Sequence, residues 1–133
     1  MEEESEQGIS SFPRNSRRIL IVDHDETILY LLRRFFIGHG FEVLIAKDGM
    51  EAKKRLKTGW PDIVLTDLKM PFLSGVDLID FIHQNMKGLP IVVMTAYSHL
   101  FPDRKSEIKV DAYYVKPFDV DEMLSSIERI LRG

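Results

Sequence analysis

The chain has 133 residues, of which 44% are hydrophobic and 29% are charged, a composition typical of one soluble globular domain. Its formal net charge of −3 argues against a nucleic-acid-binding domain, and the absence of cysteine excludes disulfides and thiolate metal sites. The apolar runs are far shorter than a membrane span, and the acidic N-terminus lacks the features of a signal peptide. We therefore expect a cytoplasmic protein with no membrane segment and no direct contact with nucleic acid.

The first residues differ in composition from the rest of the chain. Residues 1–16 are rich in Glu, Ser and Gln and carry few apolar side chains. Such a segment cannot bury enough apolar surface to order itself, so we expect a flexible N-terminal tail. From Arg17 onward apolar runs recur regularly, and we expect one folded domain over residues 17–133.

Within this domain, short apolar runs typical of buried strands alternate with segments of helical periodicity. The expected strands are residues 18–23, 41–46, 61–67, 89–96 and 110–118. The expected helices are residues 25–40, 48–59, 74–86, 98–109 and 119–132, and Pro102 near the start of 98–109 makes that helix the least regular. This alternation predicts an α/β fold: a (βα)5 doubly wound, parallel five-stranded sheet with helices on both faces, of the flavodoxin-like kind.

The first and last expected helices show apolar positions and capping residues. In the first, apolar residues fall at helical spacing and Asp25 is suited to cap the N-terminus. These apolar residues are Ile28, Leu31, Leu32, Phe35 and Phe36. In the last, Asp119 or Asp121 is suited to the same capping role.

Polar residues gather where the expected strands end. In an open α/β sheet the carboxyl ends of the strands meet at one edge, and function collects there. Taken singly, each of these residues also has an ordinary structural explanation as a strand end, a helix cap or a solvated lysine. Together, at adjacent strand ends, they indicate a site. They are Asp23, His24 and Asp25 after the first strand, Asp67 after the third, Thr95 in the fourth and Lys116 in the fifth.

This set of side chains fits phosphoryl transfer to a carboxylate. An aspartate can attack phosphorus and form an acyl phosphate. A metal ion must then neutralise the phosphoryl oxygens, and further carboxylates must hold that metal. A hydroxyl and an ammonium can bind the oxygens of the transferred group. Asp23, Asp67, Thr95 and Lys116 supply these roles.

Four segments resemble the receiver domain of response regulators in two-component signalling, over residues 17–132: "ILIVDHDETIL", "DIVLTDLKMPFLSG", "IVVMTA" and "YYVKPF". The resemblance implies a (βα)5 fold and Mg²⁺-dependent phosphorylation by a sensor histidine kinase or phosphotransfer protein. It implies that Asp67 is the phospho-acceptor and that Asp23 and the backbone carbonyl of Lys69 bind the metal. Thr95 and Lys116 would contact the phosphoryl group. The loop after the acceptor would be shaped by Met70, Pro71 and Gly75, with glycine tolerating the backbone angles of such a loop.

The same resemblance implies a conformational switch. Thr95 would move toward the phosphoryl group while Tyr113 turns inward, changing the face formed by helix four, strand five and helix five. That face would bind a downstream protein, act on an output domain outside this sequence, or form a homodimer. Lys69 and Tyr97 stand at the positions that tune dephosphorylation. Because both side chains are long enough to shield the acyl phosphate, we expect slow self-dephosphorylation.

His24 departs from the family pattern, which has a second acidic residue at this position. Three consequences stay open. Mg²⁺ still binds, more weakly, through Asp23, Asp67, a carbonyl and waters. Alternatively, Mn²⁺ is accepted better, since imidazole suits transition metals. In the third case a protonated His24 replaces part of the metal's charge, and the chain is a pseudo-receiver, a binding scaffold that is not phosphorylated.

Two other functions fit the sequence poorly. A flavodoxin-like nucleotide or flavin binder needs a Gly- or Ser/Thr-rich phosphate loop after the first strand, whereas "DHDETI" is acidic and would repel phosphate. The lysine-rich run "KKRLK" at residues 53–57 is typical of a solvated helix face rather than a DNA-binding patch. The receiver function leaves open a stand-alone protein or the receiver part of a longer regulator, and the sequence names no kinase.

Overall fold

The computed structural model describes residues 17–70, 73–96 and 109–133. The expected N-terminal tail, the expected helix over 98–108 and two candidate site residues, Pro71 and Tyr97, lie outside these ranges. Lys109, where that helix was expected to end, is described and is not helical.

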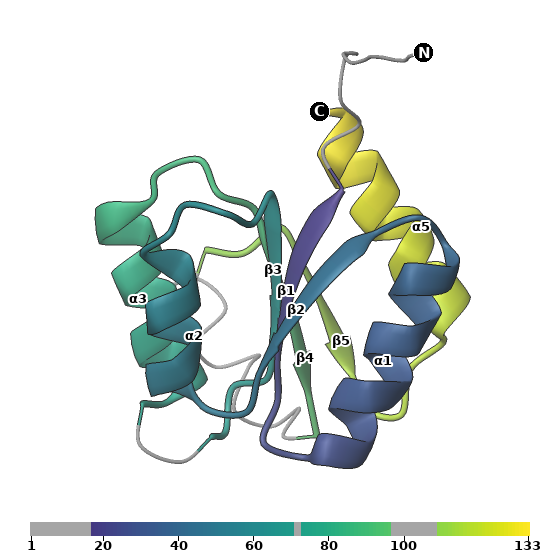
Figure 1. The fold of residues 1–133 in the computed structure, drawn as a ribbon, viewed down its shortest axis with the longest axis horizontal. Coiled ribbons are helices and arrows are strands. Elements are labelled where there is room, and N and C mark those ends of the chain that lie inside the picture. The colour runs from purple at the N-terminus through teal and green to yellow at the C-terminus, as the bar shows by residue number, and fades with distance from the viewer. Residues whose placement is uncertain (1–16, 71–72, 97–108) are drawn as a thin grey trace, which may run out of the picture.

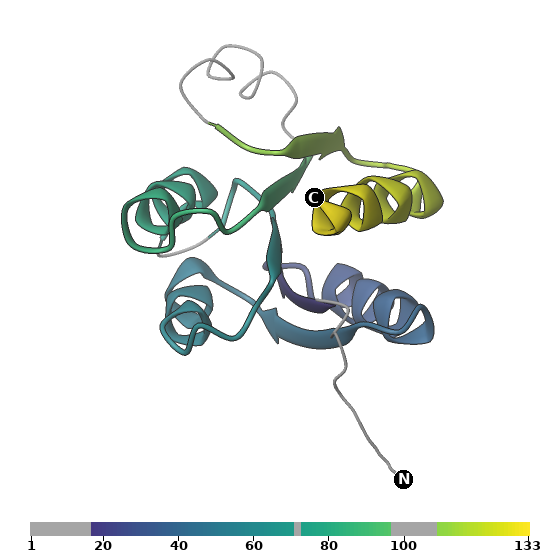
Figure 2. The same cartoon turned by 90° about the horizontal axis from the view of Figure 1, so that it is seen from above.

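The described residues form one sheet of five parallel strands in the order β2-β1-β3-β4-β5. The strands are β1 (Arg18–Val22), β2 (Glu42–Ala46), β3 (Ile63–Thr66), β4 (Ile91–Thr95) and β5 (Ala112–Val115). The helices of the described ranges are α1 (Glu26–Gly38), α2 (Gly49–Leu56), α3 (Gly75–Asn85) and α5 (Val120–Arg132) (Figure 1). Viewed from above, α2 and α3 cover one face of the sheet and α1 and α5 cover the other (Figure 2). The predicted doubly wound α/β fold is thus confirmed.

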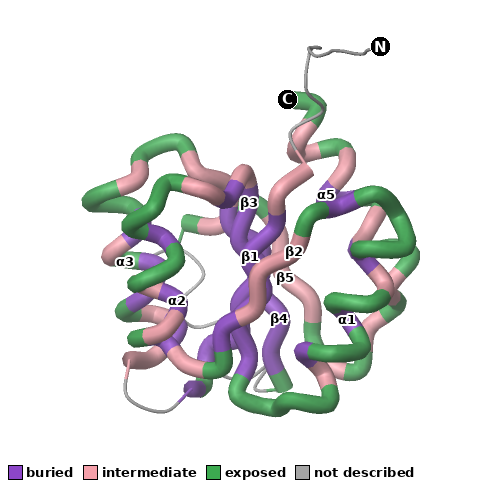
Figure 3. Tube along the Cα trace, in the orientation of Figure 1, coloured by how far each residue is buried: buried purple, intermediate pink, exposed green. Residues whose placement is uncertain are grey.

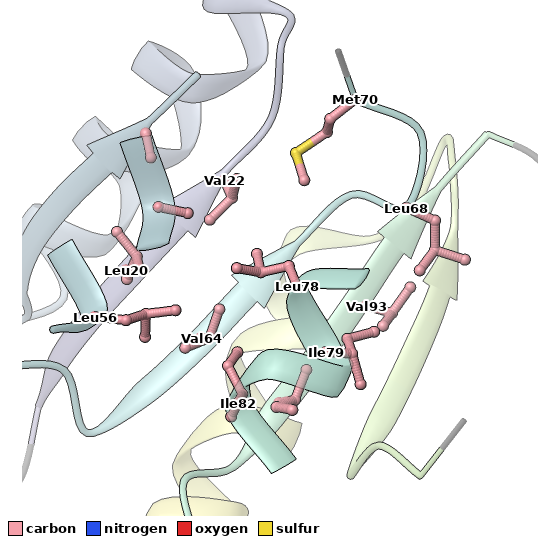
Figure 4. Close-up of a cluster of buried hydrophobic side chains, with 13 residues drawn as sticks. Leu20, Val22, Leu56, Val64, Leu68, Met70, Leu78, Ile79, Ile82 and Val93 are labelled. Carbon is pink, nitrogen blue, oxygen red and sulfur yellow. The ribbon is translucent and has the colours of Figure 1, made fainter. Parts of the chain in front are cut away.

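Successive side chains of a strand point to opposite faces of the sheet, and helices cover both faces. The central strands are therefore buried on both sides (Figure 3). In β1, Leu20 and Val22 pack into the cluster beneath α2 and α3 (Figure 4). Ile19 and Ile21 pack into the second cluster, beneath α1 and α5. All four are fully buried, which explains why this strand reads as a continuous apolar run.

Both expected helix caps are present. The Asp25 carboxylate accepts a hydrogen bond of 2.9 Å from the amide of Thr27 at the start of α1. Asp119, rather than Asp121, caps α5, and its carboxylate accepts a hydrogen bond of 2.9 Å from the Asp121 amide. These caps satisfy amides that have no partner within their helices.

The buried face of α1 differs from the expected stripe at two residues, because Leu29, which was not expected there, is buried and Leu31 is exposed. Leu29, Leu32 and Phe36 face the sheet, whereas Leu31 is 63% exposed and its neighbour Tyr30 is 55% exposed. This helix carries more apolar residues than one helix face can bury, so periodicity alone did not identify the exposed ones. None of the helices in the described ranges is long and apolar enough to cross a membrane.

Candidate functional site

The carboxyl ends of β1, β3 and β5 bring three charged side chains together. Asp23 follows β1 directly, and its amide donates a hydrogen bond of 3.1 Å to the carbonyl of Ala46 at the end of β2. Asp67 follows β3, and its amide donates a hydrogen bond of 2.9 Å to the Val22 carbonyl of β1. Sheet-like hydrogen bonding therefore continues one residue past each strand and fixes the backbone of both aspartates.

Asp23 is fully buried, with both carboxylate oxygens engaged. Its Oδ1 accepts a hydrogen bond of 2.9 Å from the Asp25 amide, so the turn into α1 holds the carboxylate in one orientation. Its Oδ2 lies 2.6 Å from the Lys116 ammonium. Burying a carboxylate this deeply is costly without such partners.

Asp67 is 3% exposed. Its Oδ1 accepts a hydrogen bond of 2.7 Å from the Leu68 amide and a longer one of 3.4 Å from the Lys69 amide. Its Oδ2 lies 3.3 Å from the Lys116 ammonium. Burial raises the pKa of Asp67 above its ordinary value, because the lowering effects of Lys116 and the two amides only partly offset it and the Asp23 charge adds to it.

Lys116 bridges the two aspartates from the end of β5. Its backbone amide donates a hydrogen bond of 2.8 Å to the Thr95 carbonyl, which aligns the lysine with the end of β4. Burial opposes its charge, but the hydrogen bonds and charges of Asp23 and Asp67 outweigh burial and raise the pKa of Lys116. The lysine is therefore a protonated cation placed against both carboxylates.

Thr95 and Tyr113 occupy neighbouring strands near this cluster. Thr95 is the last residue of β4 and is fully buried. Tyr113 pairs with Val93 across β4 and β5, is partly buried and packs against the core beneath α2 and α3. Tyr114 packs into the opposite core, so the two tyrosines lie on opposite faces of the sheet as strand alternation predicts.

Described residues on either side of positions 71 and 72 pack close to the Asp67 backbone. Met70 is buried in the core cluster. The Gly75 amide donates a hydrogen bond of 2.7 Å to the Leu68 carbonyl. A Cβ atom at position 75 would lie 2.2 Å from the Asp67 carbonyl oxygen and 2.4 Å from the Leu68 Cα, so glycine is required there by close packing. Our expectation that special backbone angles explain this glycine was wrong, because Gly75 is not among the glycines with positive φ.

Asp23, His24 and Asp67 can each turn one ligand atom toward a common point. These three atoms all lie within 4.8 Å of one another, and His24 Nδ1 lies 3.8 Å from Asp23 Oδ1. The imidazole is 54% exposed, whereas the two carboxylates are buried. The Lys116 ammonium already lies on both carboxylates, which shows that this pocket accepts a positive charge. The donor set therefore fits a divalent cation.

The structure thus brings Asp23, His24, Asp67 and Lys116 together in direct proximity, and it places Thr95 at the adjacent strand end. The Lys69 side chain is exposed, while its amide reaches the Asp67 carboxylate. Sequence reasoning missed that Lys116 bridges the two aspartates even without a phosphoryl group. The signal was available, because two buried carboxylates at neighbouring strand ends require a nearby cation.

Comparison with known proteins gives a consistent picture. The family model of the response regulator receiver domain matches residues 19–128. The chain is 33% identical over 118 residues to the alkaline phosphatase synthesis transcriptional regulatory protein PhoP of Bacillus subtilis, covering 88% of the chain and 49% of that protein. It is 35% identical over 119 residues to the transcriptional regulatory protein PrrA of Mycobacterium tuberculosis, covering 88% of the chain and 51% of that protein. The chain therefore spans about half the length of these relatives.

Solved structures agree with this match. The response regulator TrrA from Thermotoga maritima, crystallised with Mg²⁺-BeF, has a TM-score of 0.79 and 35% identity, over 86% of this chain and 98% of that one. A CheY-like receiver domain protein from Methanospirillum hungatei has a TM-score of 0.81 and 29% identity, over 87% of this chain and 94% of that one.

Proposed function

The chain belongs to the response regulator receiver family, and from this premise we propose that it accepts a phosphoryl group on Asp67 in a divalent-metal-dependent reaction. The donor is a sensor histidine kinase or a phosphotransfer protein. The observation that carries this proposal is the Asp67 carboxylate, buried beside Asp23 with the Lys116 ammonium on its Oδ2. The chain catalyses only its own phosphorylation and dephosphorylation.

The two oxygens of Asp67 have different roles in this mechanism. Oδ1 is held by the Leu68 and Lys69 amides, which orient the carboxylate. Oδ2 faces Lys116 and is the oxygen that attacks phosphorus, while the bond from phosphorus to the donor's leaving group breaks. Lys116 then binds an oxygen of the transferred group, and the Thr95 hydroxyl binds another.

The proposed metal site uses two carboxylates that backbone amides hold in place, those of Asp23 and Asp67. Asp23, Asp67 and the backbone carbonyl of Lys69 would hold the ion, with His24 at the exposed side. When bound, a divalent ion supplies the positive charge that lets a carboxylate approach a phosphoryl donor. The TrrA relative, solved with Mg²⁺-BeF, supports a magnesium-type ion here.

Phosphorylation would be read out at β5 and α5. Thr95 and Tyr113 lie on the two neighbouring strands that link the acceptor to this side of the sheet. We take Thr95 and Tyr113 as the switch. The expected helix over 98–109, which lies largely outside the described residues, would form with β5 and α5 the face that binds a downstream protein, an output domain or a second copy. The receiver domain runs over residues 17–133 after a tail over 1–16, and it acts in the cytoplasm.

The pseudo-receiver alternative is less well supported. A scaffold that is never phosphorylated has no need for two buried carboxylates bridged by a lysine, an arrangement that is costly to bury. His24 changes one exposed position of the site and leaves this arrangement intact.

Incubation with acetyl phosphate tests the proposal. Intact-protein mass would be measured with Mg²⁺, with Mn²⁺ and with chelator, for the wild type and for Asp67→Asn. We expect one added phosphoryl group in the wild type with a divalent ion, and none with chelator or in the variant. Addition to Asp67→Asn at the wild-type level would refute Asp67 as the acceptor. If the wild type is modified neither by acetyl phosphate nor by any histidine kinase tried, the pseudo-receiver is correct.

A further inference from the structure

We propose that His24 is a metal ligand and that it shifts the site's preference from Mg²⁺ toward Mn²⁺ and other ions that accept nitrogen ligands. The inference rests on the proposed function, because it concerns the ion that this function requires. It assigns a specific role to the residue at which this chain departs from the pattern of its family.

The geometry places the imidazole within reach of a shared ion. Donor atoms bound to one octahedral ion at about 2.1 Å lie roughly 3–4 Å from one another. The separation of 3.8 Å between His24 Nδ1 and Asp23 Oδ1 falls in this range. One ligand atom from each of Asp23, His24 and Asp67 lies within 4.8 Å of the other two, so a rotation of the exposed imidazole can bring the three donors to the spacing of a shared ion.

The three side chains also differ in how freely they can move toward an ion. Asp23 and Asp67 are buried and held by backbone amides, so their positions change little. His24 is mostly exposed, and its side chain can turn about its bonds without disturbing the core. The two carboxylates thus hold fixed positions on the buried side of the site, and the imidazole would reach an ion from the solvent side.

The chemistry of the donors sets the preference. Mg²⁺ is a hard ion that favours oxygen ligands and gains most from negative charge. Replacing a carboxylate with imidazole removes one negative charge and adds a nitrogen donor, which transition-metal ions accept. Any incoming ion must also displace Lys116 from Asp23 and Asp67, where the ammonium lies at 2.6 and 3.3 Å. An ion that also forms a bond to His24 displaces Lys116 at a lower ion concentration than an ion that does not.

Metal titration of the full chain gives the first test. Mn²⁺ binding would be followed by loss of the electron paramagnetic resonance signal of the free ion, and Mg²⁺ binding by competition against Mn²⁺. The matched variant is His24→Asp, which restores an acidic residue at this position. We expect the ratio of Mn²⁺ to Mg²⁺ affinity to be about tenfold higher in the wild type, the low end of the effect of a tuned metal contact.

Spectroscopy then asks directly whether nitrogen is bound. In pulsed electron paramagnetic resonance of the Mn²⁺-loaded protein, a coordinated imidazole gives a ¹⁴N modulation. We expect this signal in the wild type and its loss in His24→Asp. Mn²⁺ binding without the ¹⁴N signal, or equal affinity ratios in the two proteins, would overturn the role of His24.

The same samples separate this result from the proposed function. Acetyl phosphate labelling of Asp67 with Mg²⁺ in a wild type that lacks the ¹⁴N signal would leave the phosphorylation proposal standing and remove only the inference. A wild type that binds no divalent ion would overturn both.

Discussion

At the residue scale, the buried charge of Asp67 lowers the free energy of unfolding, and removing that charge should raise it. Burial is the largest cause of its raised pKa, so the folded protein holds the proton more tightly than the unfolded chain. Ionised Asp67 therefore destabilises the fold at every pH above its folded pKa. The penalty disappears as the pH falls below the ordinary value of 3.8.

We expect Asp67→Asn to be more stable than the wild type near pH 7 by about 1–2 kcal/mol, a typical size for a single substitution. The gain should shrink as the pH is lowered through the folded pKa of Asp67. Urea unfolding at several pH values measures it. Relief of the repulsion from Asp23 adds to this gain, and loss of the ion pair with Lys116 reduces it. A variant less stable than the wild type at pH 7 would contradict this view of the site.

Gly75 is a second residue whose substitution should affect the acceptor directly. A Cβ at this position meets the backbone of Asp67 and Leu68. We expect Gly75→Ala to lower the free energy of unfolding by about 1–3 kcal/mol, the usual cost of overpacking, and to slow phosphorylation by acetyl phosphate. Gly38→Ala is the matched control, because a Cβ there meets nothing within 4 Å. Equal stability and equal phosphorylation rates in the two variants would show that the backbone around Asp67 and Leu68 can shift to accommodate the added methyl group.

The lifetime of the acyl phosphate depends on the residues around Asp67. Lys69 is exposed beside the acceptor, and its cationic side chain does not accept a hydrogen bond from an attacking water. We expect slow self-dephosphorylation of the wild type and faster decay in Lys69→Asn, whose amide can orient water. Decay of the phosphoprotein after removal of acetyl phosphate measures this. A wild-type lifetime of seconds would count against the expectation.

Much of the site at this scale was predictable from sequence. Parallel strands place their carboxyl ends at one edge, so Asp23, Asp67 and Lys116 had to converge once the strands were identified. The partner of each oxygen was not predictable, because it depends on side-chain distances. The reason for Gly75 was also hidden, since sequence does not reveal how closely two backbone segments approach.

At the element scale, α1 shows that hydrophobic periodicity predicts a helix but does not determine which of its apolar residues are buried. Leu29, Leu32 and Phe36 are buried, and Tyr30 and Leu31 are exposed, although all five are apolar. The turn capped by Asp25 and the packing on β1 fix the rotation of the helix, and neither is encoded in a count of apolar residues. Large apolar side chains exposed together are typical of a protein-binding surface.

We therefore expect Leu31→Glu to impair phosphotransfer from a kinase that phosphorylates the wild type. Because α1 begins three residues after Asp23, we expect a donor protein that reaches Asp67 to contact this helix. The rate from the kinase should fall roughly tenfold, as for loss of one strong interface contact, while the rate from acetyl phosphate is unchanged. Met50→Glu, at an exposed position on α2, is the control. Loss of both rates would indicate damage to the fold instead.

At the scale of the whole molecule, Arg17 connects the start of the sheet to two helices. Its guanidinium lies 3.0 Å from Glu128 of α5, donates a hydrogen bond of 3.2 Å to the His39 carbonyl after α1, and lies over the Phe41 ring. The residues before Arg17 are polar and were expected to form a tail. The boundary of the domain should therefore fall at this arginine.

Removing residues 1–16 should leave the free energy of unfolding and the extent of phosphorylation unchanged. Arg17→Ala in the full chain should reduce stability by about 1 kcal/mol, the upper range for a partly exposed ion pair with a cation–π contact. Urea unfolding of both proteins makes the comparison. A large loss of stability on removing 1–16 would show that the tail is part of the folded domain.

The fold as a whole was predictable for a simple reason. Five buried apolar runs alternating with helical segments allow few arrangements other than a doubly wound parallel sheet. The opposite faces of Tyr113 and Tyr114 then follow from strand alternation. The strand order β2-β1-β3-β4-β5 was not predicted, because doubly wound sheets with the same alternation occur in more than one order. The effect of His24 does not follow in the same way, because it depends on the balance between an imidazole, a lysine and an incoming ion.

The most direct test of the central claim is to identify the residue that carries the phosphoryl group. After reaction with acetyl phosphate and a divalent ion, sodium borohydride reduces an acyl phosphate to an alcohol and so converts a phosphorylated aspartate to homoserine. Peptide mass spectrometry then locates the conversion. We predict homoserine at position 67 alone. Conversion at Asp23 or Asp25, or a phosphoryl group found on His24 with Asp67 unchanged, would contradict the assignment of Asp67 as the acceptor.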